Sequence, residues 1–183
     1  MNHYKTTILI LVTSVLLNFF QLAYAANAES DTIIQDAVLV HINEYRQQHG
    51  LSKLTMDNTI VKEAKNHSID MANHTIPFGH KYFNTRINRL HLHIKNSNAG
   101  AENIAYNYKN AQDVVKNWLL SPGHKRNIDG NYNLTGIGIA RDKKGKLYFT
   151  QIFLRTGSGN KYAVRKPFHT IFNGSFFRKN NLI

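Results

Sequence analysis

The sequence predicts an α+β domain in which helices come first and a pair of antiparallel strands follows. Apolar residues recur at three- and four-residue steps between residues 31 and 45, as on one face of a helix. Later in the chain the period changes, and Leu134–Ala140 and Lys146–Arg155 are rich in the β-branched and aromatic residues typical of strands. Asp142 to Gly145 supply turn chemistry between them, which predicts a hairpin. Helices followed by antiparallel strands are typical of a layered α+β domain.

Two helices are expected in the first half of the domain. The first begins at Asp31, a capping residue, and ends at Gly50, where a left-handed conformation is favoured. Its buried face is expected to comprise Ile33, Ile34, Ala37, Val38, Ile42 and Tyr45. The second begins near Asp57 and ends before Pro77, with the inward candidates Ile60, Ala64, Ile69 and Met71.

The stretch from residue 80 to residue 110 is polar and rich in Asn. We expect a short helix at Thr85–Leu90 within it, followed by a loop that approaches Glu102. A further helix is expected at Ala111–Leu120, capped by Asn110, with a buried face of Val114, Val115, Trp118 and Leu119. A short helical segment that opens at a first-turn proline should follow.

The N-terminus has the layout of a secretory signal. Lys5 precedes 13 nearly all apolar residues, Ile8–Phe20, and small residues follow at Ala23 and Ala25. We expect cleavage after Ala25 and a secreted or periplasmic protein. A retained membrane anchor is the alternative, although 13 residues fall short of the roughly 20 that span a bilayer as a helix. The chain has no cysteine, which excludes disulfides and a lipid anchor on cysteine.

These signals divide the chain into a signal peptide at residues 1–25, one domain at residues 31–155 and a tail at residues 156–183. Removing 25 of the 183 residues leaves 158, which is enough for one packed core.

The charge is strongly basic and unevenly placed. Lys and Arg number 23 against 11 Asp and Glu, a net charge of +12, and nine bases but no acid follow Asp142. The positive electrostatic field of such a segment attracts anionic partners such as lipid headgroups, acidic cell-wall polymers or nucleic acid. The alternative is a solvated face that keeps the protein soluble. The tail mixes bases with phenylalanines, which suits a membrane or cell-wall surface, or else an added strand or a loosely ordered end. Nucleic acid is disfavoured because the chain is expected to be exported and carries no nucleic-acid motif.

Three polar residues stand in otherwise structural segments: His80, Glu102 and His124. They are 22 residues apart, so no local geometry brings them together, and singly each is more often a hydrogen-bonded structural residue. As a set they could coordinate a metal, act as general acid and base, or present donors and acceptors to a ligand. Ser121 is the nearby hydroxyl, but with Pro122 after it we expect its oxygen to cap a helix rather than to act as a nucleophile.

Six segments of the sequence, in this order, resemble the CAP domain of the cysteine-rich secretory, antigen 5 and pathogenesis-related proteins, particularly its bacterial secreted branch. They are "INEYRQQHGLSKL", "FGH", "AGAENIAY", "VVKNWLLSPGHKRNI", "TGIGIA" and "YFTQIF". The resemblance extends from Val38 to Arg155, about 118 residues. The resemblance implies a three-layer α-β-α sandwich in which a central antiparallel sheet lies between helical layers.

The resemblance also implies a cleft lined by two His and two Glu, which holds a divalent metal in several members. His80, Glu102 and His124 match three of these positions, and Ser121 stands where the fourth acid would be. Zn²⁺ could still take two imidazoles, one carboxylate and water. Alternatively, Glu102 could hold one imidazole in a fixed tautomer.

Asn103 and Asn127 are expected to bond backbone groups that shape this cleft, or else to be turn residues. The favoured function is a non-enzymatic module that binds an anionic or amphipathic ligand from a lipid, the envelope or a host surface. The alternative is a metal-assisted hydrolase that uses His80, Glu102 and His124.

Overall fold

The computed structural model describes residues 31–157, so the expected signal peptide and nearly all of the expected tail lie outside the described residues. A helix covers residues 31–48. The elements that follow are β1 (Thr55–Met56), α2 (Asn58–Ala72), α3 (Phe83–His93), β2 (Ser97–Tyr106), α4 (Ala111–Leu120), α5 (Pro122–Asp129), β3 (Leu134–Arg141) and β4 (Leu147–Thr156). None of the helices within the described residues is long and apolar enough to cross a membrane.

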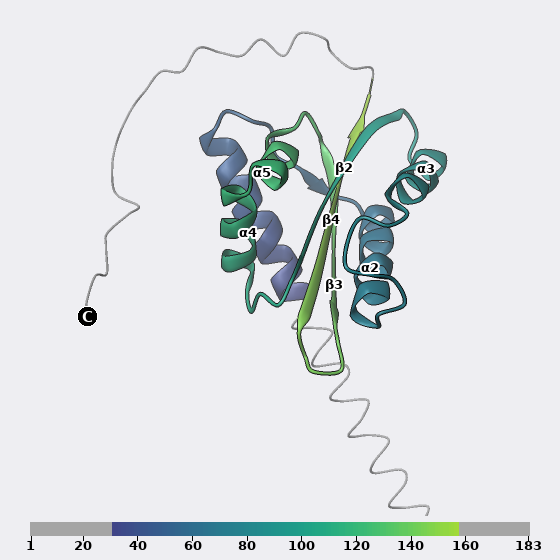
Figure 1. Ribbon diagram of the computed structural model, residues 1–183. Coiled ribbons are helices and arrows are strands. Elements are labelled where there is room, and N and C mark those ends of the chain that lie inside the picture. The colour runs from purple at the N-terminus through teal and green to yellow at the C-terminus, as the bar shows by residue number, and fades with distance from the viewer. Residues whose placement is uncertain (1–30, 158–183) are drawn as a thin grey trace, which may run out of the picture.

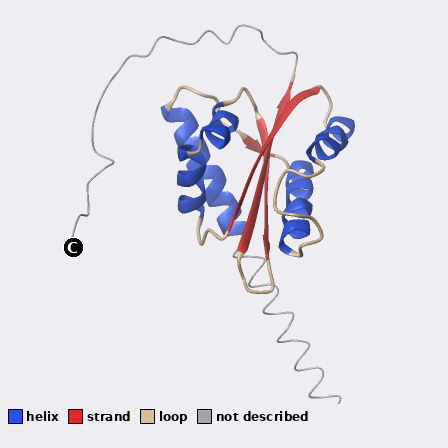
Figure 2. Ribbon diagram, viewed as in Figure 1, coloured by secondary structure: helices blue, strands red, loops and turns tan. Residues whose placement is uncertain are grey.

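The four strands form one sheet with the order β1-β3-β4-β2. β4 pairs antiparallel with both β3 and β2, and the two-residue β1 runs parallel to β3. The helix over residues 31–48, drawn in purple, lies with α4 and α5 on one side of the sheet, and α2 and α3 lie on the other (Figure 1; Figure 2). This arrangement confirms the expected α-β-α sandwich with an antiparallel centre.

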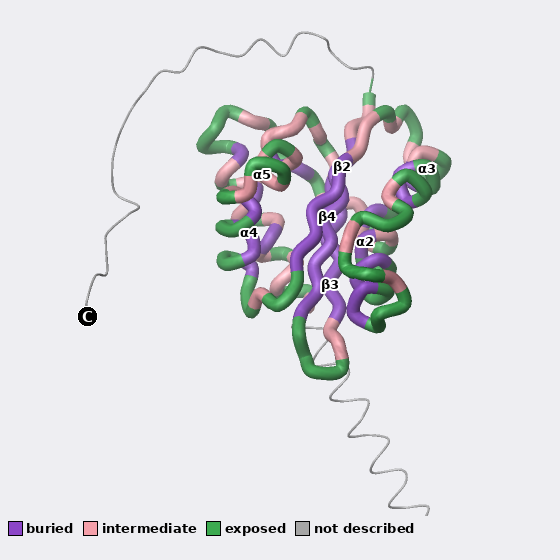
Figure 3. Tube along the Cα trace, in the orientation of Figure 1, coloured by how far each residue is buried: buried purple, intermediate pink, exposed green. Residues whose placement is uncertain are grey.

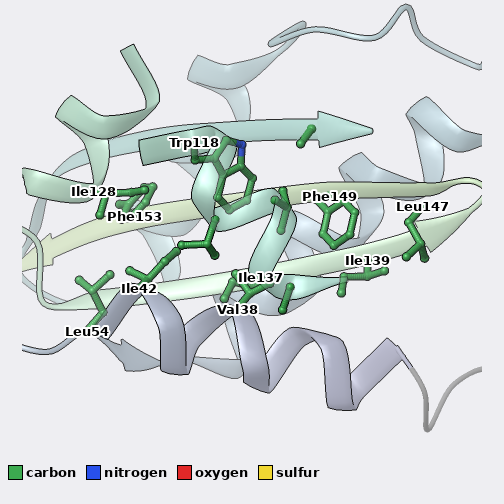
Figure 4. Close-up of a cluster of buried hydrophobic side chains, with 14 of the residues drawn as sticks. Val38, Ile42, Leu54, Trp118, Ile128, Ile137, Ile139, Leu147, Phe149 and Phe153 are labelled. Atoms are coloured by element: carbon green, nitrogen blue, oxygen red, sulfur yellow. The ribbon is translucent and has the colours of Figure 1, made fainter. Parts of the chain in front are cut away.

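β4 is the central strand of the core, because helices cover it on both faces. Phe149 and Phe153 join the larger apolar cluster, which includes Val38, Trp118 and Ile137 (Figure 4). Ile152 and Leu154 point to the other side and pack with residues of α2 and α3. The first eight residues of β4 are all buried, and in Figure 3 the part of the trace coloured as buried runs along this strand through the centre of the molecule.

Two glycines of β3 allow α2 to lie directly against the sheet. A Cβ at Gly138 would lie 2.1 Å from the backbone nitrogen of Lys65, and one at Gly136 would lie 2.3 Å from that of Val61. No side chain fits at such distances, so the "TGIGIA" segment alternates glycine toward α2 with isoleucine toward the larger cluster.

Several local signals in the sequence are confirmed. Asp57 caps α2 by accepting hydrogen bonds from two backbone N–H groups, and Asn110 caps α4 by accepting one. Gly50 has the expected left-handed backbone, with φ of 70°. The hairpin strands begin and end within one residue of the expected bounds.

Other expectations are wrong. The stretch before and after Glu102 is not a loop but the ten-residue β2, which pairs with β4 along its length because its polar groups find partners on neighbouring helices. The helix expected at Thr85–Leu90 is present, and it extends further at both ends, over Phe83–His93. Ile33 and Ile69 are exposed rather than buried, at 64% and 37%. Ile69 falls outside the inward face of α2, which is formed by Ile60, Ala64, His67, Ser68, Met71 and Ala72.

Candidate functional site

Glu102 lies near the middle of β2 with its carboxylate buried between α2 and α3. Arg86 of α3 donates to both carboxylate oxygens, from Nε to Oε2 at 2.8 Å and from Nη2 to Oε1 at 2.7 Å. A third bond runs from its Nη1 to the carbonyl of Lys81 at 2.7 Å. This is a buried, two-pronged ion pair, the geometry in which arginine binds carboxylate most strongly. The charge of Glu102 is thus matched inside the protein.

Two imidazoles flank the same carboxylate. Nδ1 of His80 donates to Oε1 of Glu102 at 2.8 Å, which places the proton on Nδ1, and the ring is half exposed. His67 of α2 is buried, with Nε2 bonded to the carbonyl of Gly79 at 3.0 Å and 3.8 Å from Oε1 of Glu102. Nδ1 of His67 has no partner among the described residues. His67 therefore holds the backbone that carries His80.

The surroundings favour an ionised carboxylate at Glu102 and neutral rings at His67 and His124. Burial alone would raise the pKa of Glu102, but hydrogen bonds from His80 and Arg86 outweigh it and lower that pKa. Burial lowers the pKa of His67, more than the nearby Glu102 raises it. Burial, with a smaller contribution from the charge of His80, also lowers the pKa of His124.

The free edge of β2 is bonded by side chains of α4 and α5. Trp118 donates its indole N–H to the carbonyl of Ile104 at 3.2 Å, and Asn127 donates to the carbonyl of Glu102 at 3.1 Å. Asn127 also bonds Oδ1 of Asn103 at 2.8 Å, and Asn103 bonds the carbonyl of His124 at 3.2 Å. These bonds explain why "ENIA" and the segment from Trp118 to Asn127 occur together: they place His124 beside the edge strand that carries Glu102.

A hollow of about 280 Å³, here called the aromatic hollow, lies next to His124. It is lined by Phe78, Ile104, Ala105, Tyr106, Tyr108, Asn117, Trp118, Ser121 and His124. Nδ1 of His124 is buried without a partner among the described residues. Ser121 precedes α5 as expected, but its side chain makes no capping bond, so the expected role of its oxygen is wrong.

The residues present do not fit the three-ligand zinc site expected from the sequence. Both oxygens of Glu102 already accept bonds from Arg86, and one accepts a further bond from His80. Residues 31–157 contain no group of three or more His, Asp or Glu that could hold a metal ion. Zinc binding by His80, Glu102 and His124 therefore finds no support in the contacts of Glu102.

Sequence reasoning missed His67 and Arg86, although both carried a signal. His67 stands on the same helical face as Ile60 and Ala64, so its spacing placed it inward. Arg86 sits one residue before Ile87 and four before Leu90, on the buried face of α3. A basic residue on an apolar helix face needs buried acceptors, and the carboxylate of Glu102 supplies them to Arg86.

A family model described as "CAP: Cysteine-rich secretory protein family" matches residues 39–153, and the chain belongs to this family. In sequence it is 35% identical over 127 residues to the uncharacterized membrane protein YlbC of Bacillus subtilis, and 33% identical over 114 residues to the uncharacterized protein YkwD of the same organism. The matches cover 68% and 61% of this chain but 35% and 43% of those proteins. The chain thus spans less than half the length of these relatives.

Solved structures show the same fold. An outer surface protein of Borrelia burgdorferi matches with a TM-score of 0.58 and 25% identity, over 65% of this chain and 90% of that one. An extracellular protein with an SCP domain from Bacillus anthracis gives 0.57 and 25%, over 69% and 41%. A cysteine-rich secretory protein of Staphylococcus aureus gives 0.60 at 20% identity, over 70% and 40%, which supports the fold alone.

Proposed function

We propose that this chain is an exported, non-enzymatic binding module of the cell envelope or surroundings. Its ligand site is the aromatic hollow with the adjoining His80 and His124. The observation that carries the proposal is the pairing of Glu102 with Arg86, because it commits the only carboxylate of the matched site to a structural ion pair. The extracellular and outer-surface descriptions of two structural relatives support the location.

The chemistry of the hollow favours binding over catalysis. No hydrogen bond within the described residues joins Ser121 to an imidazole, so a hydroxyl nucleophile lacks the base that would activate it. The oxygens of Glu102 accept bonds from His80 and Arg86, so Glu102 is not placed to act as the general base that the hydrolase alternative assigns to it. Half-exposed rings of Phe78 and Tyr106 offer apolar faces, and Asn117 and His124 offer polar groups beside them. This mixture suits a ligand with one apolar face and several hydrogen-bonding groups.

The single tryptophan of the chain provides the test, because Trp118 lines the hollow. Chitotetraose and lysophosphatidylcholine, the latter below its critical micelle concentration, are titrated against the purified protein while Trp118 fluorescence is recorded. We expect a saturable change with at least one probe, weakened about tenfold or more in Tyr106→Ala because a stacked ring contributes about 1–3 kcal/mol. The matched control is Tyr82→Ala, an exposed tyrosine outside the hollow.

The hydrolase alternative is tested on the same preparation. Metal analysis of protein purified without chelator, together with an assay for peptide and ester hydrolysis, decides it. Stoichiometric zinc combined with hydrolysis that is lost in His80→Ala and His124→Ala would overturn the proposal. No fluorescence change with either probe would contradict it as well.

A further inference from the structure

A second hollow adjoins the aromatic hollow and differs from it in charge. It has a volume of about 380 Å³ and lies at the β3–β4 hairpin, so it is called the hairpin hollow. Its lining residues are Ala72, Asn73, His74, Tyr106, Asp142, Lys143, Lys144, Lys146 and Tyr148. Tyr106 lines both hollows, so the two meet at this ring.

Positive charge is confined to the hairpin end of that surface. Three lysines line the hairpin hollow, whereas no Lys or Arg lines the aromatic hollow. The one carboxylate in the hairpin hollow, Asp142, accepts bonds at Oδ1 from the backbone N–H groups of Lys144 and Lys146. These bonds lower the pKa of Asp142, so it stays ionised, and the three lysines still outnumber it. An anionic group is therefore favoured at this end and only there.

The aromatic rings between the two ends form a half-exposed platform. The ring centroids of Phe78 and Tyr106 are 4.9 Å apart, and those of Tyr106 and Tyr148 are 5.6 Å apart with an angle of 27° between the rings. Phe78 is 47% exposed and Tyr106 is 46% exposed, while Tyr148 is buried beneath them. Such a platform covers one face of a ligand and leaves the opposite face in water.

We propose that this surface binds a glycan strand that carries neutral sugar rings and an acidic sugar. The inference rests on the proposed function and names its ligand class. Neutral rings lie on Tyr106 and Phe78 and reach into the aromatic hollow, and the acidic group lies at the lysines of the hairpin hollow. A sugar ring presents C–H groups on one face, which contact an aromatic ring, and hydroxyls at its edge, which bond water and amides such as Asn117.

Two other ligand classes fit less well. An acyl chain would stay partly in water on rings that are half exposed, whereas apolar ligands are bound where most of their surface is covered. A nucleic-acid strand carries a phosphate at every base and is bound by cations along its whole path, but the aromatic hollow has none. A glycan with a single acidic residue matches the observed separation of rings and charge.

The test uses linear tetrasaccharides in matched pairs, titrated against the full protein with Trp118 fluorescence as the readout. Cellotetraose and chitotetraose are each compared with the form that ends in a uronic acid. Anionic phosphatidylglycerol vesicles and a single-stranded oligothymidylate are the competing probes. The hairpin variant replaces Lys143, Lys144 and Lys146 with Gln. The control variant, with the same change in net charge, replaces Lys62, Lys65 and Lys116, which are exposed on α2 and α4, with Gln.

We expect at least one acidic tetrasaccharide to bind about tenfold more tightly than its neutral partner, since a few exposed ion pairs together reach that size. The hairpin variant should lose this preference and keep the neutral affinity, and the control variant should keep both. Equal affinity for the acidic and neutral forms would overturn this inference, and so would a preference for the acidic form that survives in the hairpin variant. In either case, binding that is weakened by Tyr106→Ala would still support the proposed function. Tighter, lysine-dependent binding of vesicles or oligothymidylate would overturn the choice of a glycan. Absence of any Tyr106-dependent signal would end both proposals.

Discussion

The two faces of the sheet differ in the size of their apolar clusters. The face covered by the helix over residues 31–48, α4 and α5 carries one continuous apolar cluster of fifteen buried residues. The face covered by α2 and α3 carries two smaller clusters, of six and five buried residues. Buried polar contacts lie on both faces. On the second face Ser68 bonds Thr150 at 2.8 Å, and Arg86 and His80 bond Glu102. On the first face the buried Arg46 donates to the carbonyls of Ile128 and Gly130.

The difference separates stability from site geometry. An apolar core stabilises the folded state in proportion to the area that it buries, and it tolerates substitution by apolar side chains of similar shape. A buried polar network is favourable only when each of its groups has a hydrogen-bond partner. The first face should therefore supply most of the free energy of folding. The second face gives up apolar contacts and gains a fixed position for His80, which the ion pair and the bond from His67 to Gly79 both define.

The largest effect should come from truncating the first face. Phe153→Ala removes a fully buried ring from the larger cluster and should lower the free energy of unfolding by about 3–5 kcal/mol. Urea unfolding followed by circular dichroism measures it. Leu92→Ala, at a residue that is 84% exposed, is the control and should change stability by less than about 0.5 kcal/mol. A Phe153→Ala loss as small as the control would refute the assignment of stability to this face.

A somewhat smaller effect is expected on the second face, and it should be strongly non-additive. Glu102→Gln or Arg86→Met alone leaves a buried charge without its partner and should cost about 3 kcal/mol. The double variant removes both charges and should be more stable than either single variant. The same urea experiment on all four proteins completes the cycle. Simple additivity would show that the ion pair is not coupled as described.

The smallest effect should be a loss of stability in acid. The pKa values of His67 and His124 are lowered in the folded protein, so the unfolded chain binds more protons and stability declines as the pH falls below about 6.5. The lowered pKa of Glu102 adds a further decline below about 4.5. His67→Asn removes one of these titrating rings, so the free energy of unfolding should decline less steeply between pH 7 and pH 5. The charged groups Glu102 and Arg86 and the ring of His80 still face this position in the variant. Unfolding free energies measured across this range would contradict the assignment if the slope were unchanged.

Much of the fold was predictable because its signals are local. The caps at Asp57 and Asn110, the turn at Gly145 and the two long strands of the hairpin follow from residue types at fixed offsets. β2 was not predictable in this way. Its polar sequence lacks the alternation of a strand, because Arg86 and Asn127 satisfy groups that would otherwise need water.

The site was predictable only in part for a related reason. The family resemblance pointed to His80, Glu102 and His124, and the structure joins the first two directly. Spacing along the chain could not reveal that Arg86, rather than a metal, would face the carboxylate, because that contact depends on how α3 crosses the sheet. The hollow around Tyr106 likewise depends on residues from separate segments of the chain.

The side-chain bonds from Trp118 and Asn127 to β2 have a consequence for behaviour in crowded surroundings. An extended peptide joins a sheet by pairing with unpaired carbonyl and N–H groups along its border. The carbonyls of Glu102 and Ile104 already have indole and amide donors, and the opposite border of the described sheet is the two-residue β1. A neighbouring copy thus finds few free carbonyls on β2 with which to pair, so this strand is poorly suited to intermolecular strand addition.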